Sequence, residues 1–179
     1  MLKSLSHAQR VTLFGHVTFK PHPTKNDPDA VIMPWDWKAK HLREYMVPQL
    51  ARLGVNHSVT FHYKSGPRMV KLWQAWDDRG YLDAVATWNG SFVTRFKRGS
   101  ARANEYDLSN HSWGTAFDIN ARLMPRGTPI AKVPPEFLEL VPVAEEFGFA
   151  WGGYFGTPDP MHFECVESEH ETEQRLNRR

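Results

Sequence analysis

The sequence predicts a single α+β domain, and three observations support this prediction. The chain has 179 residues, which is enough for one hydrophobic core and too few for two comfortable domains. Hydrophobic residues make up 41% of the chain and charged residues 23%, proportions that are typical of a soluble globular protein. Short β-rich segments alternate with about three helical patterns, with no internal repeat or low-complexity linker between them.

The first part of the chain predicts two short strands followed by a helix. Residues 11–19 mix β-branched and aromatic side chains and end before Pro21, which is typical of a strand. Residues 30–33 predict a second, brief strand. Over residues 36–53 the apolar side chains recur at helical spacing, and Gly54 is placed to end this helix.

The middle of the chain predicts a strand, a helix and a hairpin. Residues 55–63 are rich in β-forming side chains and indicate a strand. Residues 67–83 indicate a second helix, because they begin with a proline in the favoured first-turn position and continue with helical periodicity. Residues 85–88 and 91–96 flank Asn89-Gly90, the strongest short turn signal, so we expect them to pair as a hairpin.

The last third of the chain predicts two strands around a third helix. Residues 115–120 and 161–166 have strand character, and residues 134–147 carry apolar side chains on one helical face. Gly148 follows the expected end of that helix. Residues 167–179 are almost wholly charged or polar, so we expect a solvated or frayed tail there.

Charge and composition exclude several classes of protein. The net charge is only +2 at pH 7 and no run of Lys and Arg occurs, so we expect no nucleic-acid partner. A single cysteine, Cys165, rules out an internal disulfide. No stretch of 18 apolar residues occurs, so we expect no transmembrane segment. We also expect a monomeric protein. Residues 1–10 lack the apolar block of a signal peptide, which leaves export by another route or a leader missing from the sequence.

Two short segments carry the residues best suited to catalysis. Residues 109–118 read Ser-Asn-His-Ser-Trp-Gly-Thr-Ala-Phe-Asp, and residues 159–164 read Asp-Pro-Met-His-Phe-Glu. Imidazoles and carboxylates are the usual ligands of Zn²⁺, and a catalytic zinc needs three of them and an open position. The residues alone do not distinguish ligands from a nearby general base. Asp159 or His162, for example, could bind the metal while the other faces the bound water.

The two segments together resemble the signature of a known enzyme family. Ser-x-His-x-x-Gly-x-Ala-x-Asp is similar to the motif of the zinc D-Ala-D-Ala carboxypeptidases and L-alanyl-D-glutamate endopeptidases, which include phage endolysins. The family's second motif, an acid three residues before a zinc-binding His, is matched by Asp159 and His162, and Trp151-Gly152-Gly153 resembles its lead-in. The similarity covers roughly residues 88–164. It implies a hedgehog/DD-peptidase-like fold with a small antiparallel sheet.

The resemblance also implies roles for individual residues. One zinc ion would be held by His111, Asp118 and His162. Asp159 would act as the catalytic base. An upstream arginine would contact the substrate and polarise the scissile carbonyl; Arg95 is the best match, and Arg98 competes with it.

For several neighbouring residues the sequence allows either a functional or a structural role. Ser109 could hydrogen-bond a zinc ligand or cap a local turn. Trp113, together with Trp151 and Tyr154, could flank the cleft and touch the substrate, or pack in the core or at its rim. Strand alternation places Glu164 on the same face as His162, which favours a supporting role near the site.

The resemblance implies zinc-dependent hydrolysis of peptide bonds in bacterial peptidoglycan stem peptides by a domain of residues 1–166, with residues 167–179 as a tail. The base is Asp, as in the endopeptidase branch, whereas the dipeptidase branch uses Glu. We therefore expect an endolysin-like enzyme that acts on the bacterial cell wall between L-Ala and D-Glu. A D-Ala-D-Ala carboxypeptidase is the alternative, and a catalytically inactive, zinc-stabilised binding module related to hedgehog is another.

Overall fold

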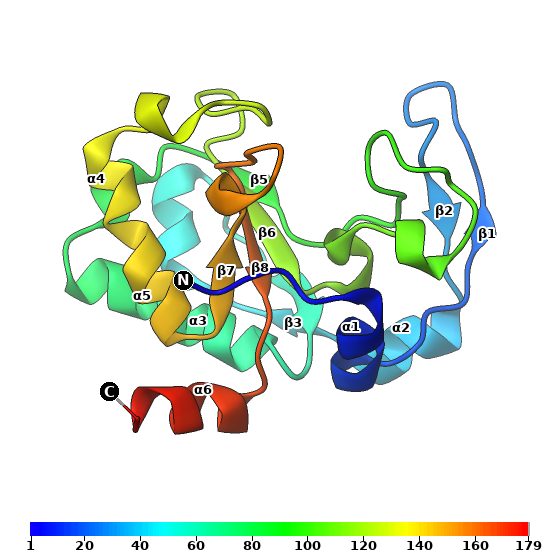
Figure 1. Cartoon of the computed structure of the whole chain (residues 1–179), viewed down its shortest axis with the longest axis horizontal. Coiled ribbons are helices and arrows are strands. Elements are labelled where there is room, and N and C mark those ends of the chain that lie inside the picture. Colours follow the sequence, from blue (N-terminus) through cyan, green and yellow to red (C-terminus); the bar gives the residue numbers. More distant parts are fainter. Residues whose placement is uncertain (179) are drawn as a thin grey trace.

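A computed structural model describes residues 1–178 and shows a single α+β domain, which confirms the predicted fold class (Figure 1). Six α-helices occur in this part of the chain: α1 (His7–Phe14), α2 (Trp35–His41), α3 (Gly66–Asp78), α4 (Pro135–Leu138), α5 (Leu140–Glu146) and α6 (Glu169–Leu176). Short 3₁₀ helices lie between them at Pro48–Leu53, Leu82–Ala84, Glu105–Asp107, Asn110–Trp113, Ile130–Lys132 and Gly152–Tyr154. No helix within residues 1–178 combines the length and apolar character that crossing a membrane requires.

The centre of the fold is a four-stranded antiparallel sheet with the strand order β5-β6-β8-β7. Its strands are β5 (Trp88–Gly90), β6 (Ala116–Ile119), β7 (Phe149–Trp151) and β8 (His162–Cys165). Two smaller antiparallel pairs accompany it, β1 (Lys20–Pro21) with β2 (Val31–Ile32) and β3 (Leu42–Tyr45) with β4 (Val59–His62). In Figure 1, α3, α4 and α5 lie to the left of the sheet, and α1, α2 and the β1–β2 pair lie to the right.

Strand alternation separates the core face of the sheet from the face that carries the chemistry. Phe117 of β6 stacks on Phe163 of β8, with ring centroids 5.4 Å apart, and both rings pack against Trp76 of α3. Successive side chains of a strand point to opposite faces, so the neighbours of these two phenylalanines face away from α3. The neighbours are Asp118 on β6 and His162 on β8.

The structure confirms four of the predicted strands and one helix. β2, β4, β6 and β8 lie inside the segments that the sequence assigned to strands, and α3 fills most of the segment assigned to the second helix. The third helix is present but is divided into α4 and α5. Pro142 explains the division, because it cannot donate to the carbonyl of Leu138 and its ring crowds that carbonyl.

Three other predictions for the first hundred residues are wrong. Residues 11–19 are not a strand, because Ser6 and Gln9 form a capping box that starts α1 at His7. The helix expected over residues 36–53 ends at His41, and the following residues form β3 because they pair in register with β4. The expected hairpin is absent from the described residues, since β5 pairs with β6 rather than with residues 91–96.

The C-terminal segment is more ordered than a frayed tail. Ser168 and Glu171 form a capping box that starts α6. The guanidinium of Arg68, in α3, donates to the carbonyl of Phe147 and to the hydroxyl of Thr172, and so ties α6 to the core. Most side chains of this segment are exposed, as expected of a solvated tail, but the segment is helical rather than frayed. The sequence pattern does not reveal the buried arginine that holds it.

Candidate metal centre

Three side chains from two strands and one 3₁₀ helix converge above the sheet. Asp118 of β6 and His162 of β8 are directly opposite each other in the antiparallel register, where side chains on one face are close neighbours. His111 comes from the 3₁₀ helix Asn110–Trp113, which ends at Gly114 in a left-handed conformation with φ 64°. A Cβ at Gly114 would lie 2.8 Å from Leu42 Cδ2, so this turn requires glycine. We call the three side chains the His–Asp–His cluster.

The spacing within the cluster fits a tetrahedral metal ion. His111 Nε2 lies 3.2 Å from His162 Nδ1 and 3.2 Å from Asp118 Oδ1, and His162 Nδ1 lies 2.9 Å from Asp118 Oδ1. Ligands about 2.0–2.1 Å from a tetrahedral zinc are roughly 3.3 Å apart from one another. The three atoms therefore form a triangle slightly smaller than one face of a zinc tetrahedron, and a small adjustment would admit the ion.

The outer hydrogen bonds of the two histidines orient their lone pairs toward this triangle. The carbonyl oxygen of Ser91 lies 2.8 Å from His111 Nδ1 and can only accept, so Nδ1 carries the proton and Nε2 is left as an acceptor. Glu164 Oε2 lies 3.1 Å from His162 Nε2 and has the same effect on the neutral ring of His162. Two imidazole lone pairs and a carboxylate oxygen then face one another, which is the arrangement that a cation stabilises.

Without a metal ion, the close contacts within the cluster shift the pKa values of its own side chains. Burial lowers the pKa of His162, but hydrogen bonds to Asp118 and Glu164 outweigh it and raise this pKa to about 10. Burial would likewise raise the pKa of Asp118, yet its contacts with His111 and His162 hold it far below its usual range. A proton on His162 thus supplies the positive charge that a metal would supply.

Asp159 lies beside the cluster with a carboxylate oxygen available. Its backbone carbonyl accepts from the amide of His162 at 3.0 Å, and its own amide donates to the carbonyl of Gly152 at 2.8 Å. Asp159 Oδ1 is buried and has no hydrogen-bond partner among the described residues. Burial raises the pKa of Asp159, with a further increase from the charge of Asp118. A carboxylate with a raised pKa and an unused oxygen is suited to accept a proton.

The Trp151-Gly152-Gly153 segment makes room for Asp159. A Cβ on Gly152 would lie 2.5 Å from the carbonyl oxygen of Asp159 and 3.1 Å from His162 Cβ. Any side chain at position 152 would therefore push the Asp159 turn away from the cluster. The indole of Trp151 is buried and donates to the carbonyl of Pro160 at 2.7 Å, which holds the same turn from its other side.

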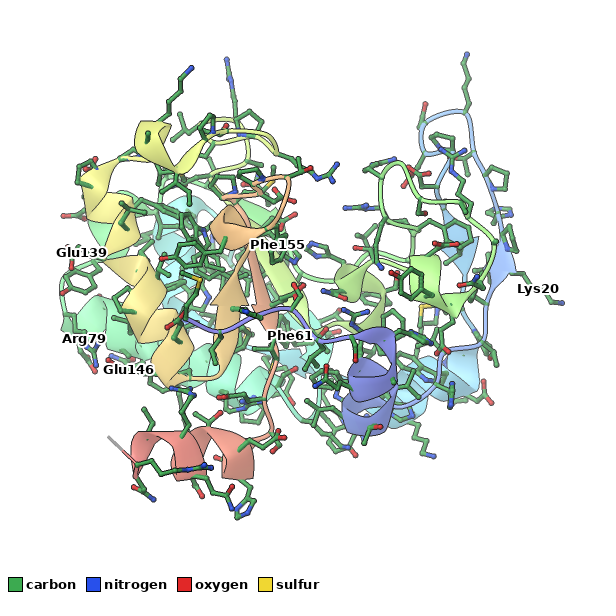
Figure 2. All side chains as sticks on the ribbon, viewed as in Figure 1. Lys20, Phe61, Arg79, Glu139, Glu146 and Phe155 are labelled. Atoms are coloured by element: carbon green, nitrogen blue, oxygen red, sulfur yellow. The ribbon has the colours of Figure 1, made fainter. Side chains whose placement is uncertain are left out.

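A cavity of about 520 Å³ opens onto the cluster and Asp159. Phe155, labelled in Figure 2, lines it, and its ring centroid is 5.9 Å from that of His162. Arg95, Arg98 and Arg126 also line the cavity, so cationic side chains surround the acidic centre. A ligand of this cavity would meet apolar, anionic and cationic groups within one site.

The structure distinguishes the two arginines that the sequence left open. Arg98 Nη1 binds Asp29 Oδ2 at 2.6 Å and Asp27 Oδ1 at 2.9 Å, so structural ion pairs occupy its guanidinium. The guanidinium of Arg95 bonds only the carbonyl of Phe96, at 3.1 Å, within the described chain. Burial, followed by the nearby charge of Arg98, lowers the pKa of Arg95. Arg95 therefore retains more capacity to bind a ligand than Arg98.

The remaining residues expected near the site have different surroundings. Trp113 is fully buried and its indole donates to the carbonyl of Gly15 at 3.0 Å, so it packs in the core and does not line the cavity. Ser109 lines the cavity, and its side chain does not cap the local turn, which was one of the two roles considered for it. Glu164 bonds His162 as described. Tyr154 is 41% exposed and Trp151 is buried, and neither lines the cavity.

Two further residues of the site were not found from the sequence. Asn110 donates through Nδ2 to Glu164 Oε2, and its Oδ1 is buried without a partner in the described residues. Asn110 directly precedes His111 in the first motif, and this position could have indicated that it lies near the site. Arg126 lines the cavity from the segment between β6 and α4, and no local sequence signal distinguishes it from the other surface arginines.

Comparisons with known proteins agree with this geometry. Residues 102–165, about a third of the chain, match the model of a family described as D-alanyl-D-alanine carboxypeptidase. The matched segment contains the His–Asp–His cluster and Asp159, whereas Arg95 lies outside it. The match supports a peptidase, and the cluster fits the zinc dependence that is typical of such enzymes. A search of curated proteins found no match.

Proposed function

We propose that this protein is a zinc-dependent peptidase that cleaves peptide bonds in bacterial peptidoglycan stem peptides. The convergence of three metal-binding atoms beside an unpaired, buried carboxylate oxygen carries this proposal. The match of residues 102–165 to carboxypeptidases supports the substrate class.

In the proposed reaction, metal binding and proton transfer are carried out by different residues. His111, Asp118 and His162 would hold one zinc ion, which supplies a Lewis acid that polarises a carbonyl and makes water more acidic. Asp159 takes a proton from the attacking water through Oδ1 and delivers it to the nitrogen of the leaving amine. The raised pKa of Asp159 brings its two protonation states closer in free energy, as this exchange requires.

Arg95 is the group best suited to stabilise negative charge on the carbonyl oxygen. It lines the cavity, and its charge interacts with that of Asp118 in the cluster. A guanidinium in a partly buried site binds an oxyanion more strongly than it would in water. The ion pairs of Arg98 with Asp27 and Asp29 occupy its guanidinium, which favours Arg95 as the donor.

The bond between L-Ala and D-Glu is the favoured substrate bond. An aspartate base is similar to that of the endopeptidase branch of the family, which favours this bond over the terminal D-Ala-D-Ala bond. The printed description of the matched family favours the carboxypeptidase instead. Both reactions use the same groups, and they differ only in the part of the stem peptide that occupies the cavity.

The test is digestion of purified peptidoglycan, followed by mass spectrometry of the released peptides. We expect new amino termini at D-Glu with the zinc-loaded protein, loss of these products with a chelator, and recovery with added zinc. Free D-Ala as the only product would select the carboxypeptidase reaction. The absence of any product from a protein that binds one equivalent of zinc would overturn the proposed activity and favour an inactive binding module.

The variant His111→Ala tests the cluster directly. It removes one of three ligands, so both bound zinc and product formation should be lost together. His57→Ala is a matched control, because His57 is exposed and lies outside the cavity. It should retain zinc and activity.

A further inference from the structure

Arg126 lies in a β-turn that is hydrogen-bonded to the segment carrying Asp159, the proposed base. The amide and the hydroxyl of Thr128 both donate to the carbonyl of Pro125, at 3.0 Å and 2.7 Å, which closes a β-turn around Arg126 and Gly127. Gly127 has φ 95°, the positive value that the third position of a type II turn requires. Its amide donates to the carbonyl of Pro158 at 2.6 Å, next to Asp159.

The guanidinium of Arg126 is free, unlike the other cations that line the cavity. Arg98 is paired with two aspartates, and the ammonium of Lys97 donates to the carbonyl of Tyr106 at 2.6 Å. Arg10 donates to the carbonyl of Leu5, and Arg95 donates to that of Phe96. Within residues 1–178, no hydrogen bond or ion pair engages the side chain of Arg126. The cavity thus has one exposed guanidinium that no protein group within the described residues engages.

The position of Arg126 near Asp159 places it on the leaving-amine side of the scissile bond in the proposed reaction. Arg126 and Asp159 line the same cavity, and the charge of Arg126 lowers the pKa of Asp159. In the proposed reaction Asp159 gives its proton to the leaving amine, so the residue that carries this amine lies on the Asp159 side. The α-carboxylate of that residue is only one carbon atom away from its nitrogen, and an arginine beside Asp159 can reach it.

We propose that Arg126 binds the α-carboxylate of the amino acid whose amine is released, and so selects substrates that are acidic at this position. This inference rests on the proposed peptidase function and adds the substrate group that the cavity recognises. The α-carboxylate of D-Glu in a stem peptide and the terminal carboxylate of D-Ala-D-Ala present the same chemistry to the guanidinium. Amidation of either carboxylate removes the charge and leaves the scissile bond intact.

Binding and cleavage of matched peptides test the proposal. The probes are L-Ala-D-Glu and L-Ala-D-isoglutamine, with D-Ala-D-Ala and its terminal amide as a second pair. The zinc-loaded protein should prefer the carboxylate of each pair that it accepts by about tenfold or more in KM, as expected for hydrogen bonds to a charged group. Arg126→Gln should remove this preference, so that the KM of the carboxylate form rises to about that of the amide. The lost charge also acts on Asp159, and any resulting change in kcat should be the same for both forms.

Arg122→Gln is the matched control, since Arg122 is an exposed arginine of the same segment that does not line the cavity. It should keep the full preference. Calorimetry with the Asp159→Asn variant measures binding of the same probes without turnover, so the proposal remains testable if no peptide is cleaved. If Arg126→Gln weakens binding of the acid and of the amide equally, so that the preference for the acid survives, the assignment is overturned. The pair that responds identifies which carboxylate is the source.

Discussion

At the scale of single residues, two carboxylates of one short motif have different surroundings, which support the different roles proposed for them. Glu164 is buried and bonded to His162 and to Asn110, so its charge holds an imidazole in place. Burial raises the pKa of Glu164, but the contact with His162 outweighs it, and the pKa is lowered overall. Asp159 has a raised pKa and an unpaired oxygen. These environments favour the proposed roles, support for Glu164 and base for Asp159, although both residues are carboxylates.

The variant Asp159→Asn tests the base. Asparagine keeps the size of the side chain but cannot accept the proton, so kcat should fall by about 10²–10⁴-fold. Zinc content should remain at one equivalent, because Asp159 is not a member of the cluster. Steady-state kinetics together with metal analysis by mass spectrometry check both parts. Loss of zinc in this variant would instead make Asp159 a ligand.

The variant Glu164→Gln tests the support of His162. A neutral amide orients the imidazole less strongly, so zinc affinity should fall by about 10–100-fold. Competition with a chromophoric chelator measures the change. Glu136→Gln is the control, since Glu136 is exposed on α4 and lies outside the cavity. Equal affinities for the two variants would show that Glu164 does not act through His162.

At the scale of elements, the site depends on a strand register and two glycine turns. Antiparallel pairing of β6 with β8 sets Asp118 opposite His162, and the turn at Gly114 directs the chain from His111 into β6. At Gly152, the absence of a Cβ lets the backbone of Asp159 lie close to the cluster. Each turn brings its functional residue close to the sheet only because no Cβ stands in the way.

Gly152→Ala should separate the Asp159 turn from the cluster. The new Cβ would meet the carbonyl of Asp159, and overpacking of this kind costs about 1–3 kcal/mol of unfolding free energy. Activity should fall further than stability, because the base moves. Gly156→Ala is the matched control, as nothing lies within 4 Å of a Cβ there. Urea unfolding and kinetics on both variants measure the two effects.

The elements also show what the sequence could predict. Segments with strong local signals, such as β6, β8 and α3, are predictable from residue pattern alone. The local pattern predicts helix where β3 forms, because the pairing of β3 with β4 depends on residues outside that segment. The preference for Arg95 over Arg98 rests on the ion pairs of Arg98 with Asp27 and Asp29. The proposed role of Arg126 rests on the hydrogen bond from neighbouring Gly127 to Pro158. Such long-range contacts leave no periodic mark in the sequence.

At the scale of the whole molecule, the cluster joins segments that are distant in the chain. His111 lies in a 3₁₀ helix after the long segment 91–109, and His162 lies in the last strand. A metal that binds only the folded chain stabilises it by mass action. At a free zinc concentration 1,000 times the dissociation constant, the unfolding free energy should rise by about 4 kcal/mol. Thermal melts with zinc and with a chelator measure this difference, and identical melting temperatures would contradict a folded-state site.

The pH dependence of stability should differ between the metal-free and zinc-loaded forms. In the metal-free protein the pKa of His162 is about 10, above the ordinary value of 6.5 expected in the unfolded chain. The folded state therefore binds the proton more tightly, and this stabilisation is complete below about pH 6.5 and is lost as the pH rises toward 10. A zinc-bound imidazole is neutral and carries no such proton, so the zinc-loaded form should not show this loss.

Urea unfolding of the metal-free protein at pH 6, 8 and 10 measures this dependence. The unfolding free energy should fall over the series, and His162→Gln should be less stable at pH 6 but show a much smaller decline, because it lacks the titrating ring. The comparison of slopes isolates His162 from the other ionisable groups, which are the same in both proteins. An equally steep decline in His162→Gln would assign the pH dependence to those groups. A decline confined to the metal-free protein with His162 intact would mean that the proton and the zinc ion stabilise the fold at the same place.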